Sequence, residues 1–562
     1  MTLSCTLCGD AYTFTDDEQA FLKKMTFTFG PKSVDLPEPT ECPDCRLMGR
    51  TCHRNERFLY RRTSDKSGQS MVSLYHKNPV DGQKFVIWDQ EEWRSDDWDP
   101  LSYGRDFDFS RPFFEQFKEL QQAVPHMALI TVGNENSDFT TGTGYCKNCY
   151  LINSSEYCAD CLYGKLLQTC SDCMDCAYLY DSQLCYECFS VYKSYGCTHL
   201  SFSKNCTECH FSSALTNCSH CFLCTNLNRK EYCFRNEQLT KTDYERAVAP
   251  YRDSFLKQQE ALQELRKMRE ASTHRNANIV NCEEVTGDYI ESSKNCHDCY
   301  DVNGSHDCRY LTVGVAAKDC FDCSNMYVKP ELGYATLGTI ETYHTAYCLY
   351  VFHSQNILLS EFCFHCKDLF GCSGLTRKQY CIFNTQFTKE EYEALVPKII
   401  AHMQSHGEWG KFFPPELSPF GYNETVANEY SPLSKSEALK RGYYCRDTQD
   451  EPLSVDKTIP AGQLPDRTVD IPDDVLNWAI SCAVSGRPFR LQKAELAFLR
   501  QQQLPLPRKH PDVRYDQRMK MHNPRRLWTR ACAKCGREVR TTYSPERPET
   551  VYCENCYREL IH

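Results

Sequence analysis

The sequence predicts a multidomain, β-rich fold with helices, in which compact cysteine-containing modules at both ends enclose two cysteine-rich arrays of twelve-residue coils joined by helical segments. Three observations predict this fold. Cysteine recurs at every twelfth residue from Cys149 to Cys233, C-x-x-C pairs stand near both ends, and the array and the end module each occur twice. A chain of 562 residues is long enough for several such units, each with its own core.

Composition limits the function classes. The formal net charge of −11 argues against a protein that coats nucleic acid with its whole surface. No apolar run approaches the roughly 18 residues that a membrane-spanning helix needs, and no basic segment followed by an apolar core precedes Cys5. We therefore expect a cytoplasmic protein without a membrane partner. In a reducing compartment, the 38 cysteines are expected to be metal ligands or buried thiols.

The first motif consists of two C-x-x-C pairs with a spacing typical of a metal site. A closed tetrahedral Zn²⁺ site takes four thiolates and leaves no open coordination position, so such a site is structural. The predicted ligands are Cys5, Cys8, Cys42 and Cys45. Between the two pairs, the sequence predicts a helix over residues 16–24.

A matching motif closes the chain, and its predicted zinc ligands are Cys532, Cys535, Cys553 and Cys556. Aligning Cys482 with Cys5, and the two ends with an offset of 468 from Cys42 onward, indicates that each end is a tandem of two zinc ribbons. The N-terminal tandem has Ser64 and Ser67 in its second ribbon. The first ribbon of the C-terminal tandem keeps Cys482 but has Ser485, His510 and Val513 at the other three positions. Serine and valine cannot replace thiolates, so we predict two structural zinc ions.

The twelve-residue ladder predicts a β-solenoid. Around each ladder cysteine, every third residue is small or apolar, which gives four inward positions per coil. The spacing is similar to that of the cysteine-rich β-helices of insect antifreeze proteins, but their flat threonine face is absent, so ice binding is not expected. Cysteine behaves as a small hydrophobe and suits a narrow core.

Two alternatives for the ladder remain open. Disulfides are one. The other is metal binding by four sulfurs from adjacent coils, for which the sequence offers the quartets Cys146, Cys149, Cys158, Cys161 and Cys206, Cys209, Cys218, Cys221.

The second array is a degenerate copy of the first. Cys296, Cys308 and Cys320 again step by twelve, and the ends of the two arrays match with an offset of 148. The predicted boundaries are 1–110 for the N-terminal tandem, 111–139 for a helix and linker, 140–240 for the first solenoid, 241–275 for a helical spacer, 282–388 for the second solenoid, 389–405 for a helix, 406–470 for a connector and 471–562 for the C-terminal tandem.

Several longer signatures carry a resemblance to a known family. They are Cys42-Pro43-Asp44-Cys45-Arg46, Arg54-Asn55-Glu56-Arg57, the run from Tyr103 to Phe114, Glu135-Asn136-Ser137-Asp138 and Lys147-Asn148-Cys149-Tyr150. On these signatures the chain resembles cysteine-rich zinc-ribbon proteins of candidate-phylum bacteria. The resemblance implies zinc binding and no particular activity.

Three functional hypotheses follow. The first is a non-enzymatic, zinc-binding scaffold that presents its repeats to a protein partner. The second is an RNA- or ribosome-associated protein that uses the basic segment 508–540, where the candidate contacts are Arg518, Arg525, Arg526 and Arg530. Because Arg518, Arg525 and Arg530 recur as Arg50, Arg57 and Arg62 in the duplicated ribbon, buried ion pairs are an alternative role for them.

The third hypothesis is metal or thiol buffering by the ladder. The sequence contains no defensible Ser-His-Asp set, phosphate-binding loop or paired-carboxylate motif, so neither an enzyme nor a small-molecule substrate is expected.

Overall fold

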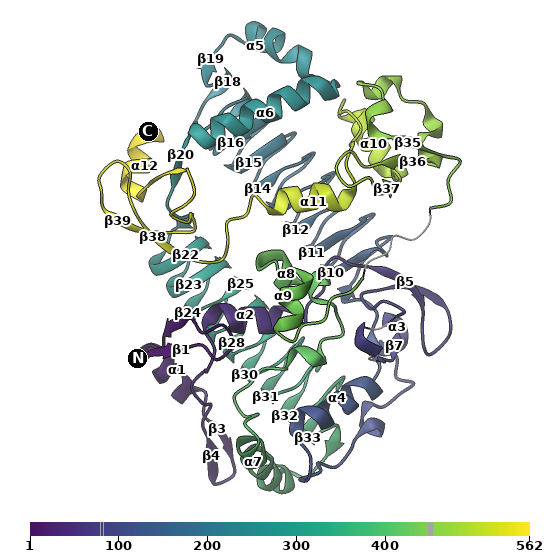
Figure 1. Ribbon diagram of the computed structural model, residues 1–562, viewed down its shortest axis with the longest axis vertical. Coiled ribbons are helices and arrows are strands. Elements are labelled where there is room, and N and C mark those ends of the chain that lie inside the picture. The colour runs from purple at the N-terminus through teal and green to yellow at the C-terminus, as the bar shows by residue number, and fades with distance from the viewer. Residues whose placement is uncertain (79, 83, 448–452, 562) are drawn as a thin grey trace.

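The computed structural model describes residues 1–78, 80–82, 84–447 and 453–561 and is dominated by two long stacks of parallel strands (Figure 1). Residues 448–452, in the predicted connector, and residue 562, in the C-terminal tandem, lie outside the described residues. The first stack, stack 1, spans residues 131–238, and the second, stack 2, spans residues 279–386.

Stack 1 has a strict twelve-residue register. Ala177 pairs with Phe189, and isolated bridges outside the strands, such as Lys147 with Ala159, join the same coils elsewhere. The antiparallel β19 (Glu237–Gln238) closes one end. The parallel strands are β9 (Thr131–Val132), β10 (Thr140–Gly144), β11 (Ile152–Glu156), β12 (Lys165–Gln168), β13 (Ala177–Tyr180), β14 (Phe189–Tyr192), β15 (Thr198–Lys204), β16 (His210–Ser213), β17 (Ser219–Phe222) and β18 (Glu231–Phe234).

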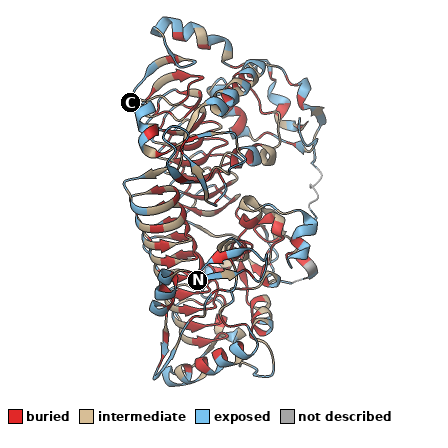
Figure 2. Ribbon diagram, turned by 60° about the vertical axis from the view of Figure 1, so that its left-hand side comes forward, coloured by how far each residue is buried: buried red, intermediate tan, exposed pale blue. Residues whose placement is uncertain are grey.

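The interior of stack 1 is a column of cysteines with aliphatic residues between them. Cys161, Cys185 and Leu179 are each fully buried, and Figure 2 shows buried residues along the strands of the stacks. Each thiol donates locally: Cys161 Sγ lies 3.3 Å from the carbonyl of Ala159 and 3.6 Å from that of Cys170. All 38 cysteines are free, so the disulfide alternative does not describe this structure.

The coils turn at residues in the left-handed backbone region. Asn148, Asp160 and Asp172 occupy one such column with φ between 51° and 54°, and Asn and Asp tolerate this region better than other non-glycine residues. Asn148 Nδ2 also donates to Asp160 Oδ1 at 3.0 Å, so the column is hydrogen-bonded from coil to coil.

Stack 2 begins with steps of eleven residues, such as Val285 with Cys296, and takes up the twelve-residue register from Gly287 onward, after a β-bulge. It has two strand-bearing faces and closes with the antiparallel β34 (Thr385–Gln386). The strand pairing continues through residues 327–360, where Cys348 is the only cysteine. One added residue at Pro330 makes a single step thirteen, so that Lys318 pairs with Glu331. The other strands are β21 (Ile279–Val280), β22 (Glu283–Glu291), β23 (Lys294–Asn303), β24 (His306–Arg309), β25 (Thr312–Val315), β26 (Lys318–Phe321), β27 (Ser324–Tyr327), β28 (Glu331–Tyr334), β29 (Leu337–Ile340), β30 (Tyr343–Ala346), β31 (Gln355–Leu358), β32 (Lys367–Phe370) and β33 (Gln379–Ile382).

Helices join the stacks and cover their flanks. The predicted helix over 16–24 is confirmed as α1 (Asp16–Lys24), which a Thr15–Glu18 capping box begins. Thr240 and Thr388 cap the helices that follow each stack. The other helices are α2 (Pro43–Thr51), α3 (Gln90–Arg94), α4 (Phe113–Ala123), α5 (Lys241–Val248), α6 (Phe255–Ala271), α7 (Lys389–Ser405), α8 (Val426–Tyr430), α9 (Lys435–Lys440), α10 (Lys493–Gln501), α11 (Pro511–Met519) and α12 (Glu554–Ile561).

Short sheets complete the end modules. Hairpins pair β1 (Thr2–Ser4) with β2 (Ala11–Thr13), β3 (Phe27–Phe29) with β4 (Lys32–Val34), β5 (Tyr60–Thr63) with β6 (Ser70–Ser73), and β38 (Trp528–Ala531) with β39 (Glu538–Thr541). β7 (Ile87–Trp88) pairs with β8 (His126–Met127), β20 (Thr273–Arg275) with β40 (Thr550–Tyr552), and β35 (Lys457–Pro460) with β36 (Trp478–Ser481), which also pairs with β37 (Pro488–Phe489).

The end modules cross over between the stacks. The N-terminal module precedes stack 1 in the chain, yet its Phe21 and Met25 share a core with Tyr334 and Leu337 of stack 2. Helix α11 of the C-terminal module follows stack 2 in the chain, yet its Tyr515 packs into a cluster with stack 1 residues. Figure 1 shows α2 beside stack 2 and α11 across stack 1, with both chain ends on the same side of the molecule.

Candidate metal centres

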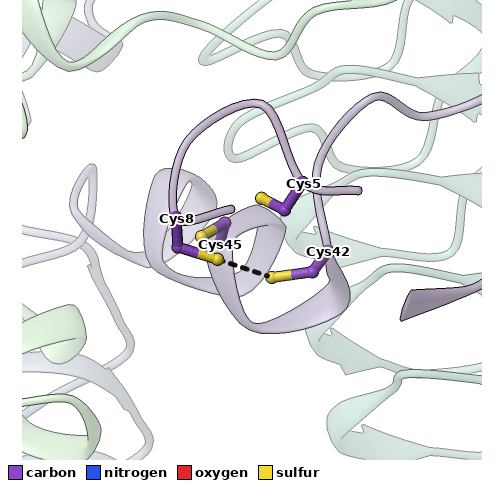
Figure 3. A group of neighbouring side chains, drawn as sticks. All are labelled: Cys5, Cys8, Cys42 and Cys45. Carbon is purple, nitrogen blue, oxygen red and sulfur yellow. Dashed lines mark hydrogen bonds between the residues drawn. The ribbon is translucent and has the colours of Figure 1, made fainter. Parts of the chain in front are cut away.

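The first four-cysteine set joins a hairpin loop to the start of a helix. Cys5 and Cys8 lie in the turn between β1 and β2, Cys42 is the N-cap of α2, and Cys45 lies in its first turn. The four sulfurs lie within 4.8 Å of one another (Figure 3), and Cys8 Sγ is 3.7 Å from Cys42 Sγ. Three of these residues are buried and Cys8 is exposed.

Local sequence explains the turn that holds the first pair. The N–H of Gly9 donates to the carbonyl of Cys5 at 3.0 Å, and Gly9 has φ of +80°, a conformation that favours glycine. Pro43 opens α2 at a position where its missing N–H costs nothing. The two cysteine pairs are thus set by a tight turn and a helix start.

The second set has the same construction at the other end of the chain. The sulfurs of Cys532, Cys535, Cys553 and Cys556 also lie within 4.8 Å of one another, and Cys535 Sγ is 3.7 Å from Cys553 Sγ. Gly536, with φ of +74°, donates to the carbonyl of Cys532 at 2.9 Å. Here too, one cysteine, Cys535, is exposed and the other three are buried.

Each set holds one thiol with a lowered pKa, Cys42 or Cys532, beside thiols whose pKa is raised, among them Cys8 and Cys556. A hydrogen bond from the Cys45 side chain is the main reason that the pKa of Cys42 falls to about 5. Burial raises the pKa of Cys532, but backbone N–H groups, that of Cys535 first, outweigh it and lower the pKa to about 6. A set that holds negative charge among four sulfurs is suited to a cation.

The two degenerate ribbons keep the turn without the ligands. Gly68 donates to the carbonyl of Ser64 at 2.9 Å and Gly486 to that of Cys482 at 3.0 Å, as in the four-cysteine sets. Ser64 stands where the intact ribbon has a cysteine ligand, and its hydroxyl donates a hydrogen bond to Glu92. Within the described residues, the metal-competent groups are therefore the two terminal sets, in agreement with two predicted sites.

The structure does not bring the ladder quartets together as metal sites. Within the described residues, neither the quartet from Cys146 to Cys161 nor that from Cys206 to Cys221 places its sulfurs within 4.8 Å of one another. These cysteines are buried, and Cys149 Sγ, for example, donates to the carbonyl of Lys147 at 3.3 Å. Core packing accounts for them.

Ladder thiols are expected to resist a thiol reagent until the protein unfolds. Reaction requires an accessible thiolate, whereas the ladder thiols are buried. Burial also raises the pKa of Cys176 and that of Cys348, the latter to about 12. With metal bound at both ends, titration with Ellman's reagent should detect the half-buried Cys282 and Cys445. The remaining thiols should react only in concentrated guanidinium and chelator. Fast reaction of most of them in the native protein would instead favour thiol buffering.

The arginines proposed as nucleic-acid contacts are mostly committed within the protein. The buried Arg518 binds Asp175 and Glu187, each at 3.0 Å, and the buried Arg525 binds Asp301 at 2.9 Å. Arg530 donates to the carbonyl of Glu549 at 3.0 Å. Only Arg526 of the four has a mostly exposed side chain, with Asp44 at 4.0 Å. Buried ion pairs, the alternative role, account for Arg518 and Arg525.

Charge reversal at Arg526 is therefore expected to leave RNA retention unchanged within about twofold. One exposed arginine beside a carboxylate neutralises too little phosphate charge for appreciable affinity. Filter binding of an oligouridine by Arg526→Glu and wild-type protein, at low and moderate salt, checks this. Tight wild-type retention that falls steeply with salt and is lost in the variant would restore the RNA hypothesis.

Two aspartates that sequence inspection missed hold the crossed modules in place. Asp322 of stack 2 forms an ion pair with Arg46 Nη2 at 2.9 Å and accepts a hydrogen bond from Arg50 Nη1 at 3.5 Å. Asp175 of stack 1 binds the equivalent pair, Arg514 and Arg518. Each aspartate directly precedes a cysteine, Cys176 or Cys323, at matching places in the two arrays. That match was a signal the sequence offered.

Comparison with family models, curated proteins and solved structures found no match to this chain. Among the described helices, none combines the length and apolar character needed to cross a membrane.

Proposed function

We propose that the protein is a non-enzymatic scaffold, stabilised by two structural zinc ions, that presents two β-solenoids to a protein partner in the cytoplasm. The observation that carries the proposal is the pair of closed four-sulfur sets. A zinc ion at about 2.3 Å from four thiolates places the sulfurs about 3.8 Å apart, close to the 3.7 Å between Cys8 and Cys42 and between Cys535 and Cys553. Four protein ligands leave no position for a substrate.

The solenoid interpretation of the stacks rests on their register. Coils pair at twelve residues both within strands and at bridges elsewhere on the coil, and the inward columns are filled by buried thiols. Such an array has a chemically inert interior and repeats its outward side chains at about the 4.8 Å spacing between strands. A scaffold uses this kind of surface.

The experiment is native purification after crosslinking in cells, with metal analysis and identification of bound protein and RNA. The proposal expects about two zinc ions per chain and a protein crosslinked to stack residues. Recovery of the chain alone, or crosslinked only to RNA, would contradict it. A zinc content well above two that exchanges readily would favour metal buffering.

A further inference from the structure

A cavity of about 820 Å³ lies where stack 1, stack 2 and the N-terminal module meet. Trp93, Trp98 and Phe352 contribute aromatic walls, and Arg54 and Ser154 also line it. Its size and its mixture of apolar walls with a few polar groups are those of a binding site. The lining cations Arg54, Arg94, Arg377 and Lys378 are matched by Glu56, Asp96, Asp99 and Glu156, so the cavity is not suited to a polyanion.

The internal duplication allows this cavity to be compared with the equivalent place in the other half of the molecule, which a side chain of the protein itself fills. Gly142 in stack 1 and Tyr289 in stack 2 each stand seven residues before the cysteine of a shared Lys-Asn-Cys motif, Cys149 or Cys296. The Tyr289 ring packs 5.5 Å from the ring of His522, and His522 is the counterpart of Arg54 in the duplicated ribbon. In one half, a tyrosine therefore packs on the ribbon residue; in the other half, glycine leaves the space open.

The neighbouring coil shows the same difference. Ser154 follows Gly142 by one coil, as Asp301 follows Tyr289. Asp301 accepts from His522 at 3.3 Å and from Arg525 at 2.9 Å. Ser154 is 7% exposed, and within the described residues its hydroxyl has no hydrogen-bond partner. The cavity therefore lacks a hydrogen-bonding group beside Ser154. This absence is notable because a buried polar group without a partner is costly.

The backbone shows where a side chain from Gly142 would go. Gly142 has φ of +59° and Tyr289 has φ of +55°, so both positions have the same conformation. A Cβ built on Gly142 would lie 3.7 Å from Arg54 Nη2, an ordinary contact distance. A larger side chain at this position would therefore extend beside Arg54, where aromatic rings stack favourably on the guanidinium plane.

We propose that this cavity receives a tyrosine side chain from an extended segment of the partner protein, in the place that Tyr289 fills in the other half. The inference rests on the proposed scaffold function and names the chemistry of its partner. The mouth of the cavity carries exposed Tyr145 and Tyr157 and charges of both signs. These features suit a polypeptide with one buried aromatic anchor and a polar surround.

A phage-displayed library of random dodecapeptides, panned on the full zinc-loaded chain, tests the proposal. Peptides with a tyrosine anchor should be enriched, and a fluorescein-labelled selected peptide should bind in fluorescence polarisation. Replacing its tyrosine with alanine should weaken binding at least tenfold. Gly142→Tyr fills the cavity in cis and should also weaken binding at least tenfold. The matched control is Gly196→Tyr, which adds the same side chain to stack 1 at φ of +65°, outside the cavity lining.

If Gly142→Tyr fails to retain two zinc ions and the wild-type melting temperature, Ser154→Ala decides the matter. This variant should reduce the preference for tyrosine over phenylalanine in the peptide to near parity. Four results would overturn the inference. Two concern the peptide: enrichment of peptides that have no aromatic anchor, and displacement of the bound peptide by oligouridine. The other two concern the variants: equal peptide binding by Gly142→Tyr and Gly196→Tyr, and an unchanged preference for tyrosine over phenylalanine in Ser154→Ala. A cellular partner that crosslinks equally to wild-type and folded Gly142→Tyr protein would overturn it while leaving the scaffold function standing.

Discussion

Replacing Cys45 with alanine is expected to lower the zinc content from two ions to one per chain and to unfold the N-terminal module. Structural zinc sites supply about 10–16 kcal/mol of binding free energy, which exceeds the stability of a small module that has few other interactions of its own. Inductively coupled plasma mass spectrometry measures the zinc, and hydrogen exchange should show lost protection in β1, β2 and α2.

The loss should spread into stack 2, because Phe21 and Met25 share its core, whereas stack 1 coils far from the module should keep their protection. Cys52→Ala is the matched control, since Cys52 is a buried cysteine directly after α2 that belongs to neither four-sulfur set. It should retain two zinc ions. Two ions in Cys45→Ala, or one in Cys52→Ala, would show that the assigned ligands are wrong.

Periodic and local features could be predicted from the sequence. The twelve-residue step from Cys149 to Cys233 reappears as the strand register, because stacked coils require the same residue type at the same place. The four-cysteine sets and α1 were also predictable, since their determinants lie within a few residues of each other or follow a fixed ligand spacing. The added residue at Pro330 was not recognised as a step of thirteen.

Long-range arrangement could not be predicted from a single sequence. Nothing near Arg46 or Arg50 specifies a partner 272 residues from Arg50, so the crossing of the modules between the stacks went unseen. The role of Arg518 stayed open between a nucleic-acid contact and a buried ion pair for the same reason: its local sequence is basic, but burial against Asp175 determines what it does. The cavity is lined by residues of the N-terminal module and of both stacks, which are far apart in the sequence, so it could not be predicted before their arrangement in space was known.

Replacing Asp322 with asparagine is expected to destabilise the packing of α2 on stack 2 by about 3–5 kcal/mol. The substitution leaves two buried guanidinium groups without their shared carboxylate, and removing one partner of a buried ion pair typically costs this much. Arg50 is the more vulnerable group, because burial already lowers its pKa. Arg46, in contrast, also lies 3.8 Å from Glu18 and donates to the carbonyl of Glu41 at 2.8 Å. Urea dependence of hydrogen exchange in α2 measures the effect.

Two further variants test whether the loss of stability depends on a carboxylate that is shared by two buried arginines. Asp175→Asn should cost less than Asp322→Asn, because Arg514 still has Glu495 at 3.1 Å and Arg518 still has Glu187 at 3.0 Å. Asp319→Asn is the surface control: its partner Lys24 has a 58% exposed side chain, so the loss should stay below about 1 kcal/mol. If all three variants lost equally little stability, the ion pairs of these arginines would not be what holds each end module on its stack. The apolar core around Phe21 would then hold the N-terminal module alone.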